Sequence, residues 1–184
     1  MLTVEEALSQ LLKTVRPICG DEKVALSDAN GRVLAETQYS RIRVPNADNS
    51  AMDGYAFRFA DVVDPDTVLT VRQRIPAGSH GEKLKKGEAA RIFTGAPLPE
   101  GADTVQRQEW CRVDGEKLKL LRFPDMGGSV RLAGEDIHTG DAVLKSGTFL
   151  QARHLGLAAA IGLADLPVVR KPEVALMSTG NELV

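Results

Sequence analysis

The pattern of apolar and polar positions along the chain has two rhythms, one typical of helices and one typical of strands. Near the N-terminus, apolar residues recur every three or four positions, as on one face of a helix: Val4, Leu8, Leu11, Leu12 and Val15. Thr3 and Glu6 fit a capping box at the start of this segment, and Pro17 and Gly20 follow its end. The sequence therefore predicts a helix over Thr3–Val15.

The segment after this helix has first a strand pattern and then a helical pattern. A short apolar run predicts a strand at Val24–Leu26, and Asp28 is placed to cap a second helix over Ala29–Glu36. From residue 41 to residue 140 the chain is rich in Gly, Pro and Asp, with short apolar alternations between them. This pattern is typical of a small β domain.

Strands are expected inside the β-rich segment where apolar positions alternate, at Val68–Ile75, Ala89–Phe93 and Val105–Val113. An Asp-Gly pair at positions 114–115 predicts a hairpin turn that joins the last of these strands to Lys117–Leu121. A helical pattern returns over residues 151–162, and Leu166–Val169 follows as a strand.

Helical flanks around a β-rich middle predict an α+β protein with an inserted domain. We expect a discontinuous first domain of helical and mixed character from residues 1–40 and 141–171, and an inserted β-rich domain over residues 41–140. Residues 172–184 are expected to begin a third, α/β domain. Val174–Met177 has the apolar character of a buried parallel strand, and the Ser178–Asn181 turn would lead into a helix. Because a lone parallel strand has no hydrogen-bonding partner, we expect the sequence to be the front part of a longer protein.

Composition narrows the possible functions. The formal net charge of −2, with 43% apolar and 26% charged residues, argues against a nucleic-acid-binding protein. No apolar run is long enough to span a bilayer, and the N-terminus does not resemble an export signal. Cys19 and Cys111 are isolated in the sequence, as is common for thiols in a reducing compartment. We therefore expect a cytoplasmic protein that binds neither nucleic acid nor membrane.

The run NADNSAMDGYA, over residues 46–56, concentrates side chains that compete with the backbone for hydrogen bonds. It can be a structural turn before a strand, or a polar loop that presents the Asp53 carboxylate to a ligand. A second run, RIFTGAPLPEGAD over residues 91–103, turns sharply after a strand at Thr94. That turn can be a simple connection, or it can present a hydroxyl and backbone N–H groups to an anion.

Two further runs carry charged groups. In VRLAGEDI, over residues 130–137, Arg131, Glu135 and Asp136 gather near a glycine, and a solvated ion pair is the plain interpretation. In STGNEL, over residues 178–183, the acid at position 182 would enter the first turn of a helix. A helix start of this kind can bind a phosphate, or the acid can serve as a cap.

The four runs NSAMDGYA, RIFTGAPLPEGADTV, VRLAGED and VALMSTGNEL are far more specific together, in this order and spacing, than singly. They resemble the molybdopterin molybdenumtransferases, the molybdenum insertases of molybdenum-cofactor synthesis, which include the E-type domain of gephyrin. The resemblance covers the whole chain but only about half of a typical family member.

The resemblance implies an elongated homodimer whose active cleft lies between one subunit's third domain and its partner's second. It implies a reaction in which molybdenum from molybdate enters adenylylated molybdopterin, AMP is released, and a divalent cation such as Mg²⁺ takes part. It also implies contact with the molybdopterin adenylyltransferase that would supply the adenylylated substrate.

Site residues follow from the motifs of the family. The resemblance assigns catalytic roles to Asp53, Thr94, Asp136 and Glu182, and substrate binding to Ser50, Arg131, Ser178 and Thr179. It makes Asp53 and Glu182 the candidate ligands of Mg²⁺. From chemistry, Arg131 would pair with an anion or orient Asp136, and the Thr94 hydroxyl would donate to a phosphate or molybdate oxygen. The acids would bind the cation or accept from pterin N–H groups.

The sequence departs from the family pattern at a few positions. Gln106 and Arg107 stand where an apolar strand is usual, Ser129 stands in place of the more usual Asn, and Ala47 in place of an aromatic residue. Two other functions stay open: a non-catalytic dimerisation or binding module of the same family, and a sugar- or nucleotide-binding β domain. We expect the 184 residues alone not to turn over, because part of the site would lie in the third domain.

Overall fold

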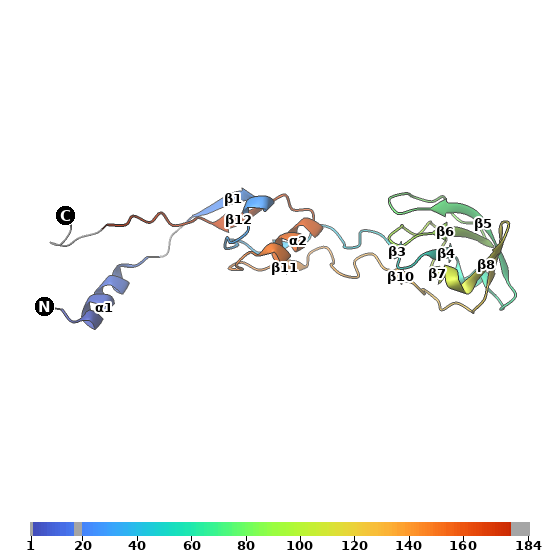
Figure 1. Ribbon diagram of the computed structural model, residues 1–184, viewed down its shortest axis with the longest axis horizontal. Coiled ribbons are helices and arrows are strands. Elements are labelled where there is room, and N and C mark those ends of the chain that lie inside the picture. Colours follow the sequence, from blue (N-terminus) through green and yellow to red (C-terminus); the bar gives the residue numbers. More distant parts are fainter. Residues whose placement is uncertain (1, 17–19, 178–184) are drawn as a thin grey trace. The chain divides into compact units, whose positions relative to one another are not determined.

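The computed structural model describes residues 2–16 and 20–177 of the chain. Two compact units are formed (Figure 1). Unit 1 combines residues 1–39 with 142–184, and unit 2 is the continuous segment 40–141. Unit 1 is thus built from two chain segments, and unit 2 is the segment between them.

In unit 1 the elements are α1 (Val4–Thr14), β1 (Asp21–Ala25), the 3₁₀ turn η1 (Leu26–Asp28), β2 (Gln38–Tyr39), β11 (Ala142–Leu144), α2 (Ala152–Ala160) and β12 (Asp165–Val169). Strand β1 pairs with β12, and β2 pairs with β11, both antiparallel. The expected helix near residue 151 and the strand near residue 166 are confirmed as α2 and β12.

Helix α1 confirms the first prediction in detail. The Thr3 side chain accepts from the Glu6 amide, and the Glu6 carboxylate accepts from the Thr3 amide, so the capping box is complete. No residue of α1 is buried. Its apolar stripe is exposed, from 53% at Leu8 to 83% at Val4, so no other described residue covers that face.

Two expectations in unit 1 are wrong. The predicted helix over Ala29–Glu36 does not form, because Val33 and Leu34 extend and bridge to Phe149 and Val168. Leu34 is fully buried in the core with Leu144, Leu150, Leu166 and Val168. Long-range pairing therefore overrides the local helical pattern.

The predicted strand over Val174–Met177 is also not formed. These residues have no regular structure, and the Leu176 side chain is 96% exposed. No described strand lies beside them to accept hydrogen bonds, which a single strand requires. The predicted turn from Ser178 onward lies outside the described residues.

The strands of unit 2 are β3 (Asn49–Ser50), β4 (Gly54–Phe57), β5 (Val68–Ile75), β6 (Glu88–Ile92), β7 (Thr104–Arg107), β8 (Cys111–Asp114), β9 (Lys117–Leu120) and β10 (Val130–Arg131). Six of them form one sheet in the order β7-β4-β6-β5-β9-β8; Figure 1 labels all of these strands except β9. Only β5 and β6 run parallel within it. Strands β3 and β10 form a separate antiparallel pair. Short 3₁₀ turns occur at η2 (Phe59–Asp61) and η3 (Gln108–Trp110).

Strand β4 is covered on both faces. Ala56 packs in one apolar cluster with Ile92 and Val105, and Phe57 packs in a second cluster with Leu69 and Leu118. Neighbouring residues of a strand point to opposite faces, so β4 forms the middle of the unit. The loop that precedes β4 is thereby anchored to a strand in which three of the four residues are buried.

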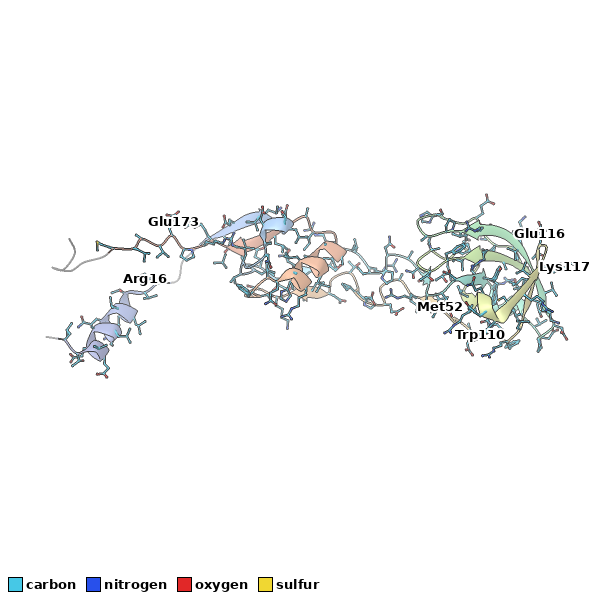
Figure 2. All side chains as sticks on the ribbon, viewed as in Figure 1. Arg16, Met52, Trp110, Glu116, Lys117 and Glu173 are labelled. Carbon is cyan, nitrogen blue, oxygen red and sulfur yellow. The ribbon has the colours of Figure 1, made fainter. Side chains whose placement is uncertain are left out.

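The strand predictions in unit 2 hold with one correction. β5 has the predicted bounds and β6 is shifted by one residue. The β8–β9 hairpin forms as predicted, but its two turn residues are Gly115 and Glu116, because Asp114 still pairs with Lys117 in the ladder (Figure 2 labels Glu116 and Lys117). The expected single strand over Val105–Val113 is two strands separated by η3. The Gln108 amide still donates to the Asp53 carbonyl at 3.1 Å, in register with the β4–β7 pairing, and the chain then turns into η3.

Candidate functional site

Strand β3 lies between two other segments of unit 2. On one side, Ser50 pairs with Val130 of β10. On the other, the Ser50 amide donates to the Ala96 carbonyl at 2.9 Å, and the Gly95 amide donates to the Ser50 carbonyl at 2.8 Å. The three runs singled out in the sequence of this unit therefore meet side by side at β3.

Ser50 is buried, with 1% of its surface exposed. Its hydroxyl donates to the Met52 carbonyl at 2.6 Å and accepts from the Met52 amide at 3.3 Å. Both contacts shape the tight loop between β3 and β4, whose Met52 side chain is labelled in Figure 2. This position does not support the expected direct contact of the Ser50 side chain with a substrate.

Asp53 and Thr94 come together from the ends of two strands. Asp53 directly precedes β4, and Thr94 follows β6 by two residues. One oxygen of the Asp53 carboxylate, Oδ1, accepts both the Thr94 amide and the Thr94 hydroxyl, each at 2.9 Å. Strands β4 and β6 are antiparallel neighbours with Gly54 opposite Ile92, which explains why the two loops meet.

These bonds stabilise the charged form of Asp53. The Thr94 amide lowers the pKa of the Asp53 carboxyl most, the Thr94 hydroxyl lowers it next, slight burial raises it, and the positive charge of Arg91 lowers it. The result is a pKa below the usual aspartate value. Asp53 is therefore an anion at neutral pH, and its Oδ2 accepts no hydrogen bond from the described residues.

The geometry corrects the role expected for the Thr94 hydroxyl. A threonine hydroxyl carries one proton, and Thr94 uses it in the bond to Asp53. While that bond is kept, the hydroxyl can accept a hydrogen bond but cannot donate one to a phosphate or molybdate oxygen. The direct partner of the Thr94 hydroxyl is therefore the Asp53 carboxylate.

The basic and acidic groups of the third run form an ion pair. Arg131 Nη2 lies 2.7 Å from both oxygens of Asp136, and Arg131 Nε lies 3.7 Å from Glu135. The Asp136 amide donates to the Val44 carbonyl, which holds the loop at its base. Two carboxylates thus surround one guanidinium, so the structure favours Arg131 as the group that orients Asp136. A free anion would have to compete with both acids.

Glycine is required next to Asp53. A Cβ atom added to Gly54 would lie 2.1 Å from the Gln106 carbonyl oxygen of the neighbouring strand β7. No side chain can be accommodated at that distance, so the close approach of β7 depends on this glycine. Gln106 itself is buried, and its amide donates to the Arg122 carbonyl at 2.9 Å. The side-chain amide of Gln106 therefore has a hydrogen-bonding partner although it lies in a buried strand.

A metal site made by this part of the chain alone is not present. The described residues contain no group of three or more His, Cys, Asp or Glu side chains able to hold an ion together. Asp53 could contribute one carboxylate oxygen. The other predicted ligand, Glu182, and the predicted substrate-binding residues Ser178 and Thr179 lie outside the described residues.

A hollow of about 210 Å³ adjoins the turn after β6. It is lined by Asn46, Ala47, Asn49, Gly78, His80, Gly95 and Pro97. Neither Asp53 nor Asp136 is among its lining residues. The carboxylates of unit 2 therefore lie outside this hollow.

Sequence reasoning missed two residues of this region, Arg91 and Gln108. Arg91 Nη1 donates to the Gly54 and Ile92 carbonyls, each at 2.8 Å, and Nη2 donates to Gln108 Oε1 at 2.5 Å. The only sequence signal was an arginine between the buried positions 90 and 92, directly before the TGAP turn. A polar residue in a strand is ordinarily solvent-facing, so this signal did not distinguish it.

The family follows from comparison with known proteins. Residues 2–162 match the family model described as "MoeA N-terminal region (domain I and II)", and the chain belongs to this family.

Neither helix of the described residues has the length and apolar character of a membrane-crossing segment.

Similar proteins carry consistent names. A protein named molybdopterin molybdenumtransferase from a Nostoc species is 42% identical over 89% of this chain and 38% of its own length. One of the same name from Haemophilus influenzae is 36% identical over the whole chain and 46% of its length. The crystal structure of the molybdopterin biosynthesis MoeA protein from Pyrococcus horikoshii superposes with a TM-score of 0.82, at 36% identity over 91% of this chain and 46% of that one. The chain thus spans less than half of these relatives.

Proposed function

We propose that the protein acts in molybdenum-cofactor biosynthesis as a molybdopterin molybdenumtransferase. In this proposal molybdenum from molybdate enters adenylylated molybdopterin, and AMP is released. Family membership and the names of relatives at 36–42% identity support it. Because the chain spans less than half of these relatives, the activity is proposed for the complete gene product that contains it.

The observation that carries the proposal in this chain is the Asp53–Thr94 pair. Its carboxylate is ionised, fixed through one oxygen and open at the other. Phosphate and molybdate are anions and would be repelled by such a group at close range. Asp53 is therefore suited to a cation that bridges to the phosphates, or to pterin N–H donors.

The residues of unit 2 fit Mg²⁺ as a partial site. Magnesium in proteins is commonly held by one or two carboxylates, with water and substrate phosphate oxygens completing six ligands. Asp53 Oδ2 would supply one such ligand, with Glu182 as the second proposed one. A bound Mg²⁺ would polarise the phosphoanhydride. The work of Thr94 is to hold the carboxylate in place and keep it charged.

Arg131 and Asp136 have a separate role in the proposal. The ion pair fixes the Asp136 carboxylate at the surface, with half of that side chain exposed. A carboxylate held in this way can accept hydrogen bonds from a neutral pterin ring without moving. The pair therefore serves substrate orientation rather than charge neutralisation.

The test replaces Asp53 by asparagine, which preserves shape and removes the charge. We expect molybdate-dependent AMP release by the complete gene product to fall by about 100-fold or more. Asp114→Asn is the matched control, because it also removes one exposed aspartate of unit 2 and an Asn-Gly pair keeps the hairpin turn. Near-normal release by Asp53→Asn would show that Asp53 has no part in the reaction.

A second candidate function, a dimerisation or binding module, is favoured by helix α1. Its apolar stripe is uncovered although both ends of the helix are well formed. We propose that this stripe packs against a second copy of the chain, in line with the homodimer that the resemblance implies. Sedimentation of the chain and of a Leu8→Ser, Leu12→Ser double variant tests it. A wild-type chain that is monomeric at micromolar concentration would contradict the module function.

A further inference from the structure

The guanidinium of Arg91 lies where the loops of Asp53 and Thr94 meet. Its Nη1 donates to the carbonyl of Gly54, the residue after Asp53, and to the carbonyl of Ile92, two residues before Thr94. Both distances are 2.8 Å. One nitrogen thus joins the backbone of the two loops whose side chains form the carboxylate–threonine pair.

The outer end of the guanidinium is fixed by Gln108. Arg91 Nη2 lies 2.5 Å from Gln108 Oε1, and the Gln108 amide donates to the Asp53 carbonyl at 3.1 Å. Asp53 is therefore enclosed by three bonded contacts: Thr94 on its carboxylate, Gln108 on its own carbonyl, and Arg91 on the next carbonyl. Arg91 and Gln108 are also hydrogen-bonded to each other, so Asp53, Gly54, Arg91 and Gln108 belong to one connected hydrogen-bond network.

Aromatic rings hold the plane of the guanidinium. The Arg91 guanidinium carbon lies 4.3 Å from the Phe93 ring centroid and 5.3 Å from that of Tyr55. Such stacking restricts an arginine side chain to few conformations. No carboxylate within ion-pair distance of Arg91 is found in residues 2–16 and 20–177. Arg91 therefore forms no salt bridge with any of these residues.

We propose that Arg91 is a positioning residue, which, with Gln108, fixes the two loops so that Thr94 meets the Asp53 carboxylate. The guanidinium bridges the two carbonyls through Nη1 and reaches the Gln108 oxygen through Nη2, so its two nitrogens hold all three acceptors at once. The consequence for turnover rests on the proposed function, but the consequence for the pair does not.

Arg74 provides a matched control. It stacks on the same Phe93 ring as Arg91, with its guanidinium carbon 4.5 Å from the ring centroid. It makes no hydrogen bond to either loop among the described residues. Arg74→Gln and Arg91→Gln therefore remove the same charge and a similar stacking contact, and differ in the bonds to the Gly54 and Ile92 carbonyls.

The experiment measures amide exchange of the Thr94 N–H by NMR in the 184-residue chain. In Arg91→Gln we expect Thr94 exchange to become about tenfold faster. Arg74→Gln should leave it near wild type. Arg91→Lys should recover only part of the protection, because its single ammonium nitrogen can donate to the two carbonyls but cannot also take the place of Nη2 at Gln108 Oε1.

Three results would overturn the inference. Arg91→Gln could lower the melting temperature yet leave the Thr94 amide unchanged, Arg74→Gln could behave like Arg91→Gln, or Arg91→Lys could restore full protection. If Arg91→Gln does not fold, Gln108→Leu tests the same set of bonds, and unchanged Thr94 exchange there would also overturn it. Molybdate-dependent AMP release is a separate readout. An inactive wild-type complete gene product would contradict the proposed function while leaving the exchange result valid.

Discussion

Thr94 donates both its backbone amide and its hydroxyl to a single oxygen of Asp53, 41 residues earlier in the chain. The two bonds have different origins, since the amide belongs to the turn and the hydroxyl to the side chain. A substitution at position 94 can therefore remove one bond and keep the other. This separation makes the pair open to a quantitative test.

Thr94→Val should raise the pKa of Asp53 without bringing it fully to the usual aspartate value, because the backbone amide bond remains. Thr94→Ser should keep the pKa low. The measurement is a carbon-detected NMR titration of the Asp53 carboxyl. A lowered folded-state pKa stabilises the fold above the unfolded-state pKa, and this stabilisation disappears as the pH falls through the folded value. In Thr94→Val this stabilisation should be smaller and its loss should be complete at a higher pH, because the folded pKa lies closer to the unfolded one. An equal midpoint in the valine and serine variants would contradict the assignment.

Asp136→Asn should have little effect on folding. Asp136 and Arg131 are 50% and 39% exposed, and exposed ion pairs contribute little to stability. We expect a melting temperature within about 2 °C of wild type, together with weaker binding of molybdopterin to the complete gene product. Asp66→Asn, which removes the exposed pair with Lys119, is the matched control and should change neither quantity. A large fall in melting temperature for Asp136→Asn alone would indicate a structural role.

Asp61 is the buried acid of unit 2 and should govern its acid stability. Burial raises the pKa of Asp61, but bonds from Arg58 and from the Gly87 amide outweigh it, so that the pKa is lowered overall. The stabilisation is therefore complete above the unfolded pKa near 4 and is lost as the pH falls through the lower folded value.

Asp61→Asn should lower the free energy of unfolding by about 3 kcal/mol at pH 7, since charged hydrogen bonds to a side chain only 2% exposed are lost. The difference from wild type should shrink below pH 4. Urea unfolding at pH 7 and pH 3 measures both values, with the exposed Asp114→Asn chain as reference. A difference that stays constant between the two pH values would contradict the charge-based explanation.

Ser129 has a backbone conformation that its side chain disfavours. It is the only described non-glycine residue with positive φ, at 52°, and its carbonyl accepts the Ala51 amide beside the Asp53 loop. Asparagine tolerates this left-handed conformation better than serine does, and asparagine is the residue more usual here by family resemblance. Ser129→Asn should therefore stabilise unit 2 by ~1 kcal/mol, measured by urea unfolding. Ser129→Val should destabilise it, and the reverse order would refute the strain argument.

The sequence predicted those elements whose signals are local. The capping box of Thr3 and Glu6 and the Asp-Gly pair of the β8–β9 hairpin both act within a few residues, and both predictions are confirmed. The failed helix over Ala29–Glu36 depended on partners more than 100 residues away, such as Phe149 opposite Val33. No pattern inside that segment could reveal them.

The candidate site was predictable to a similar extent. The resemblance named Asp53 and Thr94, and the structure brings them into contact, although it reverses the expected use of the hydroxyl proton. Arg91 and Gln108 were missed because their importance arises from strand pairing, which places them against the carbonyls around Asp53. Side-chain type alone does not indicate which carbonyl a strand arginine will reach.

The insertion of unit 2 has a practical consequence for engineering. The Ser40 amide donates to the Asp141 carbonyl at 2.9 Å, and the residues just outside, Tyr39 and Ala142, stand opposite each other in the β2–β11 ladder. Removing unit 2 would therefore leave two chain ends, Tyr39 and Ala142, that already face each other as the last residue pair before a hairpin turn does. A two-residue Asn-Gly bridge could close unit 1 after excision, and the released module could be circularised through the same junction.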